Sequence, residues 1–397
     1  MAIGEKIKGF ISQSSMIRKM FEEGQELKRI YGEDNVFDFS LGNPDVPPPQ
    51  IFQEELERVV RENLPGKHAY MPNAGYPETR IAVARYLTEV HGMEIPWENV
   101  VMTCGAGGAL NVIFKTILDP QDEVIIPIPC FVEYGFYVDN AGGVTKFVPT
   151  GPSFSLSLEA IERAITSSTK AVLINSPHNP TGRVYDEKTI RGLGDLLRRA
   201  SREMGRVIYL VSDEPYRDIV YDNVKVPSVL CSYEDSIIAT SYSKSLSLAG
   251  ERIGYLAVHP KAHDLQDLLG GLILCNRMLG FVNAPALMQR VITRIPYAKV
   301  EVKIYEEKRN ALYGILKEAG YECVLPEGAF YLFPKSPLSD DQAFVQILKK
   351  YRILAVPGRG FLAPGYFRLA YCVSDRTITR AKEGFMEARK EGTSVNM

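Results

Sequence analysis

The sequence has 397 residues and a formal net charge of −2, and 45% of its residues are hydrophobic and 24% charged. This composition is ordinary for a globular protein, and the length is sufficient for two or three domains. The nearly balanced charge argues against nucleic acid or an anionic membrane as an obligate partner, because both require a basic surface.

Cysteine spacing and hydropathy narrow the class of protein further. The six cysteines lie far apart, without a CxxC pair or a zinc-like grouping, so we expect reduced thiols and no metal site. The N-terminal stretch mixes both charges and has no apolar segment long enough for export, and no later stretch reaches the ~20 apolar residues of a membrane span. We therefore expect a cytoplasmic protein.

Helical and strand patterns alternate along most of the chain. Helices are expected at residues 16–30, 107–118, 158–166 and 186–203, and a proline-rich loop, "GNPDVPPP", follows the first of them. Short apolar runs predict seven strands, at residues 99–104, 123–128, 144–149, 171–175, 207–212, 236–241 and 253–258. Because most of these runs are continuously apolar, we expect helices on both faces of their sheet.

This alternation predicts an α/β fold with a mainly parallel seven-stranded sheet. The last run follows the previous strand too closely for a helical crossover, so we expect it to be antiparallel. After residue 260 a long helical region, at about 286–319, precedes alternating segments typical of a smaller, half-exposed sheet. We expect three parts: an N-terminal segment at 1–45, a large domain at 46–285, and a small α+β domain at 286–397 with which the N-terminal segment packs.

The segment "TCGAGGALN" follows a predicted strand and opens a predicted helix, where backbone N–H groups could bind a phosphate. Gly105 and Gly107 fit the first two positions of a GxGxxG dinucleotide motif, but Leu110 stands in place of the third glycine. The loop is therefore compatible with a phosphate and not with a dinucleotide-dependent dehydrogenase. A glycine cluster that only allows close helix packing is an equal alternative.

Two polar segments follow other strands of the sheet. Asn179 lies in "NSPHNPTG" after one strand, and Asp213 in "SDEPY" closes another, with Tyr216 three residues later. Taken singly, Asn179 reads as part of an ordinary turn and Asp213 as a helix N-cap. Their shared position instead indicates a ligand-binding site, because open α/β sheets bind ligands at the carboxyl ends of their strands.

Lys244, in "SYSKSLSLAGERIGY", also follows a strand, at a place where a merely solvating lysine is not expected. A lysine in a dry pocket near another cation, here Arg252, has a lowered pKa, so its amine can be neutral and nucleophilic. Arg252 could also bind a phosphate. An imine-forming amine, a phosphate loop, a carboxylate and a phenol together match the groups of pyridoxal 5'-phosphate.

In order and spacing, the motifs "YMPNAGYPETR", "NPTG", "SDEPY" and "SYSKSLSLAGERIGY" resemble those of class I/II pyridoxal phosphate-dependent aminotransferases. The similarity runs from "SLGNPD" to "YFRLAYC" and implies the fold-type I architecture. It also implies ping-pong transfer of an amino group from an L-amino acid to a 2-oxo acid. Lys244 would form the Schiff base and then move a proton, and Asp213 would keep the ring nitrogen protonated. Tyr216 and Asn179 would hydrogen-bond the phenolic oxygen.

The resemblance also assigns the phosphate contacts. Backbone amides of Ala106 and Gly107, together with the side chains of Ser241 and Arg252, would hold the phosphate. Tyr70 would reach the phosphate of the cofactor bound by the partner subunit. A homodimer with a shared active site is therefore part of the implied mechanism.

For the substrate, the resemblance points to an arginine clamp. Arg368 would bind the α-carboxylate as a bidentate fork, helped by Asn179 and by the backbone at Gly42. Phe131 would stack on the cofactor ring, with Tyr134 as the alternative.

The chain departs from its relatives in the phosphate loop, where Gly107 and Gly108 replace larger polar or cationic residues. A lysine there serves the distal carboxylate in one aspartate-using branch, so an aspartate-like donor and a small or neutral donor both stay open. Arg18 is a hypothetical substitute for that lysine. A pyridoxal phosphate-dependent β-lyase or decarboxylase on the same fold is the alternative activity, although Arg368 favours transamination. A non-catalytic sensor of the cofactor is disfavoured by the complete catalytic set.

Overall fold

Seven strands form the central sheet, in the order β2-β8-β7-β6-β5-β3-β4. The computed structural model describes residues 3–394, and for residues 12–22 it describes the backbone but not the side chains. The strands are β2 (Val100–Thr103), β3 (Glu123–Ile128), β4 (Val144–Pro149), β5 (Thr169–Asn175), β6 (Tyr209–Asp213), β7 (Ser236–Ser241) and β8 (Gly254–Val258). β8 pairs antiparallel with β2 and β7, and all other pairs are parallel. The predicted mainly parallel sheet and its antiparallel last strand are confirmed.

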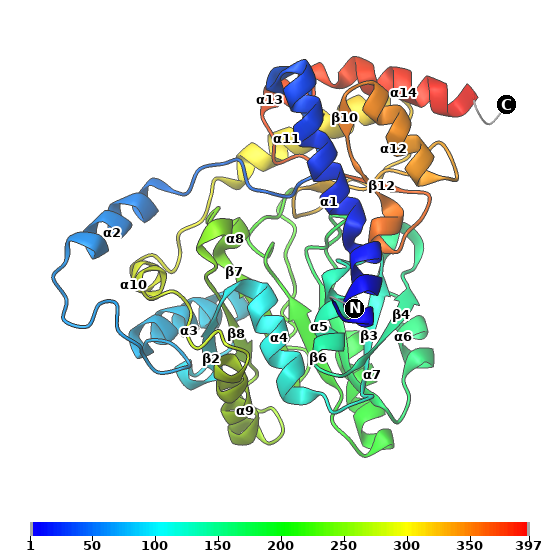
Figure 1. Cartoon of the computed structure of the whole chain (residues 1–397). Helices are drawn as coiled ribbons and strands as arrows, with labels where there is room; N and C mark the ends of the chain where they lie inside the picture. The colour runs from blue at the N-terminus through cyan, green and yellow to red at the C-terminus, as the bar shows by residue number, and fades with distance from the viewer. Residues whose placement is uncertain (1–2, 395–397) are drawn as a thin grey trace.

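Helices cover both faces of this sheet (Figure 1). Alternate residues of β5 enter two different apolar clusters, Val172 and Ile174 on one face and Ala171 and Leu173 on the other. One cluster includes residues of α3 (Pro77–His91), α6 (Leu158–Ala164), α7 (Glu187–Met204) and α10 (Ala286–Arg294). The other includes residues of α4 (Gly105–Ile117), α5 (Glu133–Asn140) and α9 (Leu265–Met278). Burial on both faces explains why the strands are continuously apolar.

A second region, at the top of Figure 1, is built around two small sheets. Its helices are α1 (Glu5–Tyr31), α11 (Val302–Glu318), α12 (Asp341–Lys350), α13 (Asp375–Arg380) and α14 (Lys382–Ser394). β1 (Phe37–Asp38) pairs parallel with β10 (Ile353–Leu354), and β12 (Phe367–Ala370) lies between β11 (Val356–Pro357) and β9 (Tyr331–Leu332) in antiparallel pairs. The N-terminal segment thus packs with C-terminal elements, while the domain boundaries at residues 45 and 285 stay predictions.

Two local predictions are wrong. The helical region at 286–319 is interrupted, because α10 ends at Arg294 and α11 begins only at Val302, with Pro296 between them. The small sheets are not half-exposed, since every residue of β9, β10, β11 and β12 is buried. Aromatic and aliphatic side chains from α11, α12 and α14 cover the small strands.

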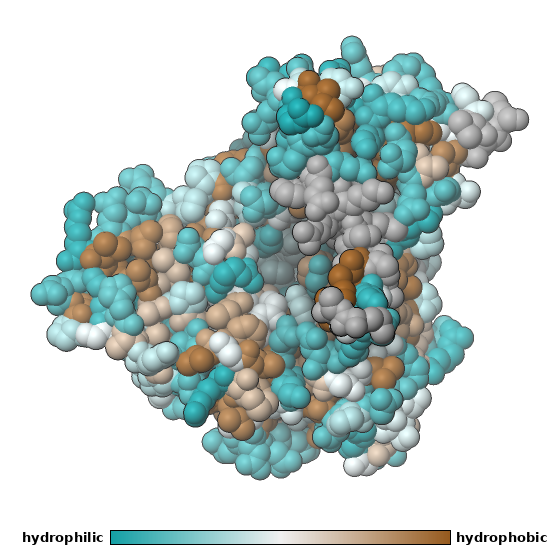
Figure 2. Space-filling view, viewed as in Figure 1, coloured by the Kyte–Doolittle hydropathy of each residue, from teal (hydrophilic) through white to brown (hydrophobic). Residues whose placement is uncertain are grey.

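Two further helices reach beyond these layers: α1 extends from the second region to the first, and α2 (Gln50–Arg61) packs on the first region through Phe52 and Val59. α1 runs from the upper helices down to α5 (Figure 1), where Lys6 pairs with Asp139 at 2.6 Å and the rings of Phe10 and Phe136 lie 4.7 Å apart. α2 stands at the edge of the molecule and exposes Ile51 and Val60, and Figure 2 shows apolar residues gathered there. None of the helices between residues 3 and 394 combines the length and apolar character of a membrane-spanning segment.

Candidate active site at the carboxyl ends of β5, β6 and β7

A cavity of about 360 Å³ lies where the neighbouring strands β5, β6 and β7 end. The surface is hollowed between α4 and the upper region of the molecule (Figure 2). The cavity is lined by eleven of the predicted site residues: Gly42, Ala106, Gly107, Phe131, Asn179, Asp213, Tyr216, Ser241, Lys244, Arg252 and Arg368. Tyr70 is not among them and is 90% exposed. The side chain of Arg18 lies outside the described residues.

Lys244 is held inside the cavity by the turn that ends β7. The short helix α8 (Tyr242–Ser245) begins directly after the strand, and the Ser241 hydroxyl caps it by accepting a hydrogen bond from Ser243 N at 3.4 Å. The Lys244 Nζ donates to the carbonyl oxygen of Gly42 at 2.7 Å. Burial lowers the pKa of Lys244 to about 8, and the positive charges of Arg368 and Arg252 act in the same direction. A substantial share of this amine is therefore neutral in the mildly alkaline range.

Asp213 closes β6 beneath the cavity. Tyr134 donates its hydroxyl hydrogen to Asp213 Oδ2 at 2.6 Å, and Asn175 Nδ2 donates to the Asp213 carbonyl oxygen at 2.8 Å. Burial raises the pKa of Asp213 to about 7, although the hydrogen bond from Tyr134 acts in the opposite direction. The second oxygen, Oδ1, is buried and has no hydrogen-bond partner among the described residues. A buried carboxylate with one free oxygen fits a cationic N–H group, such as a protonated ring nitrogen.

Arg368, on β12, presents its guanidinium from the opposite wall. It donates to Asn179 Oδ1 at 3.2 Å and to the Ser40 carbonyl oxygen at 2.7 Å. The guanidinium lies 4.6 Å from the ring centroid of Tyr331 and 4.7 Å from that of Phe361. Two rings and two hydrogen bonds thus hold the planar fork in place, and a fixed fork binds a carboxylate through two parallel hydrogen bonds.

Two phenols complete this wall. The hydroxyls of Tyr216 and Tyr331 lie 2.8 Å apart in a hydrogen bond, and burial raises the pKa of Tyr216 well above its ordinary value. Burial also raises the pKa of Tyr331, to about 12, so both phenols are neutral hydrogen-bonding groups. Gly42 packs directly on Tyr331, and a methyl group at Gly42 would collide with its hydroxyl. Only glycine allows this approach.

The start of α4 forms the third wall with Arg252. Gly105 has a φ of +71°, and a Cβ there would lie 2.8 Å from a guanidinium nitrogen of Arg252. The glycine therefore lets the Arg252 side chain cross the helix N-terminus, next to the backbone of Ala106 and Gly107. Free N–H groups and a guanidinium together make an anion site suited to a phosphate.

A family model described as "Aminotransferase class I and II" matches residues 34–385 of the chain. The chain belongs to this family. The predicted family, fold type and transaminase activity are confirmed. Members of the family transfer amino groups between amino acids and 2-oxo acids with pyridoxal phosphate.

Relatives of this aminotransferase cover nearly all of it. A solved amino transferase from Eubacterium rectale superposes with a TM-score of 0.95 at 40% identity, over 98% of this chain and 99% of that one. A probable aspartate aminotransferase from Methanocaldococcus jannaschii is 33% identical over 86% of this chain and 90% of its own length. An aspartate aminotransferase from Thermotoga maritima is 34% identical over 90% and 93%.

Sequence reasoning missed several residues that this aminotransferase places in the site. Tyr134 was expected only as the alternative stacking ring, but its hydroxyl donates to Asp213; both Tyr134 and the half-buried Phe131 line the cavity, and stacking by Phe131 stays a prediction. Tyr331 lies far along the chain from the motifs and has no local signal. Asn175 ends a predicted strand and bridges Asp213 to the backbone N–H of Asn179, which its Oδ1 accepts at 2.7 Å.

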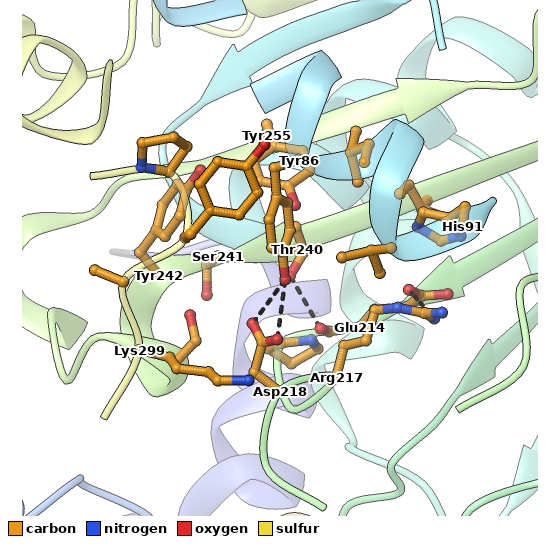
Figure 3. A pocket seen from close by; sticks show the side chains of 18 residues that line it. Tyr86, His91, Glu214, Arg217, Asp218, Thr240, Ser241, Tyr242, Tyr255 and Lys299 are labelled. Carbon is orange, nitrogen blue, oxygen red and sulfur yellow. Dashed lines mark hydrogen bonds and ion pairs between the residues drawn. The ribbon is translucent and has the colours of Figure 1, made fainter. Parts of the chain in front are cut away.

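A second cavity, of about 340 Å³, lies on the other face of the same strands (Figure 3). Asp213, the last residue of β6, lines the first cavity, and Glu214, the next residue, lines the second one. Successive residues of an extended chain point to opposite faces. Several polar groups of the second cavity bond to each other: Figure 3 shows Tyr86 pointing at Asp218, to which its hydroxyl donates at 2.9 and 3.0 Å, and Arg217 pairs with Glu214 at 2.9 Å. It contains only Ser241 of the predicted site residues. The residues predicted for amino transfer therefore gather in the first cavity.

Proposed function

We propose that this aminotransferase binds pyridoxal phosphate at Lys244 and moves an amino group from an L-amino acid to a 2-oxo acid in two half-reactions. The observation that carries the proposal is one cavity shared by a buried amine, a carboxylate with a free oxygen and a fixed arginine fork, contributed by Lys244, Asp213 and Arg368. When bound, pyridoxal phosphate supplies an aldehyde for the amine and a ring that draws electrons from the substrate's Cα.

Each polar residue of the cavity has its own role in the proposed reaction. Asp213 Oδ1 holds the proton at the ring nitrogen, and Tyr134 keeps the carboxylate in position through Oδ2. Lys244 Nζ would carry the proton between the substrate's Cα and the C4′ carbon of the cofactor, because it is the one basic amine at the strand ends among the described cavity residues. Tyr216 and Asn179 hydrogen-bond the phenolic oxygen.

Binding energy comes from the two ends of the cavity. The start of α4, at Ala106 and Gly107, holds the phosphate together with Ser241 and Arg252. At the other end, Arg368 orients the substrate through its α-carboxylate, and Phe131 covers the ring. An arginine that anchors this carboxylate also disfavours a decarboxylase, in which that group is lost.

The test uses the absorbance of the bound cofactor. Single L-amino acids, added without any 2-oxo acid, should convert the cofactor to its aminated form, and a 2-oxo acid should reverse the change. Borohydride reduction of the resting enzyme followed by digestion should place the pyridoxyl mass on the peptide that contains Lys244. Absence of the label, its presence on another peptide, or release of an elimination product from the donor would contradict the proposal.

We further propose a homodimer in which Tyr70 completes the partner's phosphate site. Tyr70 is 90% exposed although it is a large aromatic residue, and the exposed apolar side chains Val60 and Leu64 precede it. Purified heterodimers of Lys244→Ala and Tyr70→Phe subunits provide the test. In a shared site, one of the two active sites regains every wild-type residue, so activity should return to about half that of the wild type. Heterodimers no more active than the parent variants would refute the shared site.

A further inference from the structure

Glu133 is a charged residue of the active-site cavity to which no role in amino transfer falls. It is the first residue of α5, two positions after Phe131, and it lines the same cavity as Lys244 and Arg368. Its Oε2 atom is buried and has no hydrogen-bond partner among the described residues. A buried polar atom without a partner is costly, and such atoms are often satisfied by a ligand.

The cations of the cavity are already used if the proposed function holds, on which this inference rests. The described lining residues include three cations, Lys244, Arg252 and Arg368. They serve the imine, the phosphate and the α-carboxylate, respectively. No other cation is among the described residues that line the cavity, so none is left for a second carboxylate on the substrate. Apart from Asp213, the one further charged residue among them is Glu133.

Glu133 also lies within electrostatic reach of the carboxylate clamp. Burial raises its pKa, and the positive charge of Arg368 acts in the opposite direction. The two side chains share a cavity of about 360 Å³ that must also hold the cofactor. A substrate whose α-carboxylate is bound by Arg368 therefore extends its side chain through a space that Glu133 borders.

We propose that Glu133 makes this aminotransferase selective for amino donors whose side chain ends in an N–H donor, with the carboxamide as the size-matched case, over dicarboxylic donors. A carboxamide N–H can satisfy Oε2, whereas a substrate carboxylate would face a like charge in a poorly solvated space. Such a repulsive element discriminates between substrates of nearly identical shape. The proposed donor therefore differs from aspartate, the donor in the names of several relatives.

The experiment compares acid and amide pairs on the holoenzyme. Half-reaction rates at low donor concentration are measured for L-asparagine against L-aspartate and for L-glutamine against L-glutamate. The wild type should favour the amide of at least one pair by about tenfold or more. Glu133→Gln should reduce that ratio by about tenfold or more, mainly by accelerating the dicarboxylic donor. Glu159→Gln, the same chemical change at an exposed position of α6, is the matched control and should leave the ratio unchanged.

A binding measurement separates selectivity from turnover. Maleate, a dicarboxylate without an amino group, and propionate, a monocarboxylate, are titrated against the holoenzyme by calorimetry. Glu133→Gln should tighten maleate relative to propionate, whereas Glu133→Asp, which keeps the charge, should not.

Each result has one reading. Failure of the wild type to favour the amide in either pair, or an unchanged ratio in Glu133→Gln with unchanged relative maleate binding, would overturn the role of Glu133 and leave the transaminase intact. If no amino acid converts the cofactor, the proposed function itself fails. Circular dichroism shows whether Glu133→Gln is folded. If it is not, the maleate titration of Glu133→Asp tests the proposal.

Discussion

The Tyr134 hydroxyl donates a 2.6 Å hydrogen bond to one oxygen of Asp213, while the other oxygen of that carboxylate has no partner among the described residues. The two residues lie 79 positions apart in the chain. This bond stabilises the ionised carboxylate and so opposes the effect of burial on the pKa of Asp213. In the proposed mechanism Asp213 must be ionised to hold a proton on the ring nitrogen, so the hydrogen bond from Tyr134 would favour the form that is needed.

Tyr134→Phe should lower kcat/KM by about tenfold, because a hydrogen bond to a charged group is worth about 1.5–3 kcal/mol and part of it is replaced by the cofactor contact. Without the bond the pKa of Asp213 rises further, so the acidic limb of the pH–rate profile should move to higher pH. Steady-state rates measured across the pH range check both effects. Tyr313→Phe, a half-buried position on α11, is the control. An unshifted acidic limb would contradict the positioning role.

Asp213→Asn should stabilise the cofactor-free protein while inactivating the holoenzyme. The pKa of Asp213 is raised to about 7 in the folded protein from 3.8, so the folded state binds the proton more tightly and stability falls as pH rises between these values. The cost, at most about 4 kcal/mol above pH 7, disappears in the variant. The melting temperature of the cofactor-free variant should therefore exceed that of the wild type at pH 8, with a smaller difference at pH 4.

In the holoenzyme the same substitution should reduce kcat by at least about 100-fold, as expected when a preorganised charge is removed from an active site. Equal melting temperatures of the two cofactor-free proteins at pH 8 would show that the buried carboxylate carries no such cost.

Lys244→Ala should reduce turnover by at least about 10⁴-fold, because it removes both the attachment point and the general base. The phosphate contacts at α4 and Arg252 remain, so the variant should still bind the cofactor non-covalently in equilibrium dialysis. Lys188→Ala, at an exposed position of α7, should behave as the wild type. Full activity of Lys244→Ala would exclude the assignment.

Arg368→Lys should weaken binding of a monocarboxylate such as propionate by about 30- to 100-fold, since a lysine cannot form the two parallel bonds and loses its stacking on two rings. Calorimetric titration of the holoenzyme checks the loss. Arg163→Lys on α6, whose arginine is 72% exposed, should not change the affinity. Undiminished propionate binding would place the carboxylate elsewhere.

Gly42→Ala should displace Tyr331 and break its hydrogen bond to Tyr216, because the new methyl group collides with the Tyr331 hydroxyl. We expect a loss of about 1–3 kcal/mol in the free energy of unfolding, as for other overpacked sites. Gly314→Ala, which meets open space within α11, should instead be neutral or stabilising by up to about 1 kcal/mol. Urea titrations of both variants check the contrast.

The strand ends were predictable because their signals are local. A continuously apolar run marks a strand covered on both sides, and the residue that follows it lies at the carboxyl edge of a parallel sheet. That reasoning placed Asn179, Asp213 and Lys244 at one rim, and the structure brings all three to one cavity. The interruption of α10 and α11 at Pro296 was missed because the apolar periodicity continues on both sides of it.

By itself, the sequence determined the α/β architecture and the residue types predicted to bind a cofactor, because apolarity, turn chemistry and motif order act over a few residues. Only the tertiary structure decided which side chains face each other across the cavity. Tyr216 meets Tyr331 from 115 positions away, and Arg368 meets Asn179 from 189. Such pairs depend on how the C-terminal strands pack over the central sheet, and no local sequence pattern indicates which residues so far apart in the chain will meet. The unpartnered oxygens of Asp213 and Glu133 became visible for the same reason, since a missing partner is defined only when all neighbours are in place.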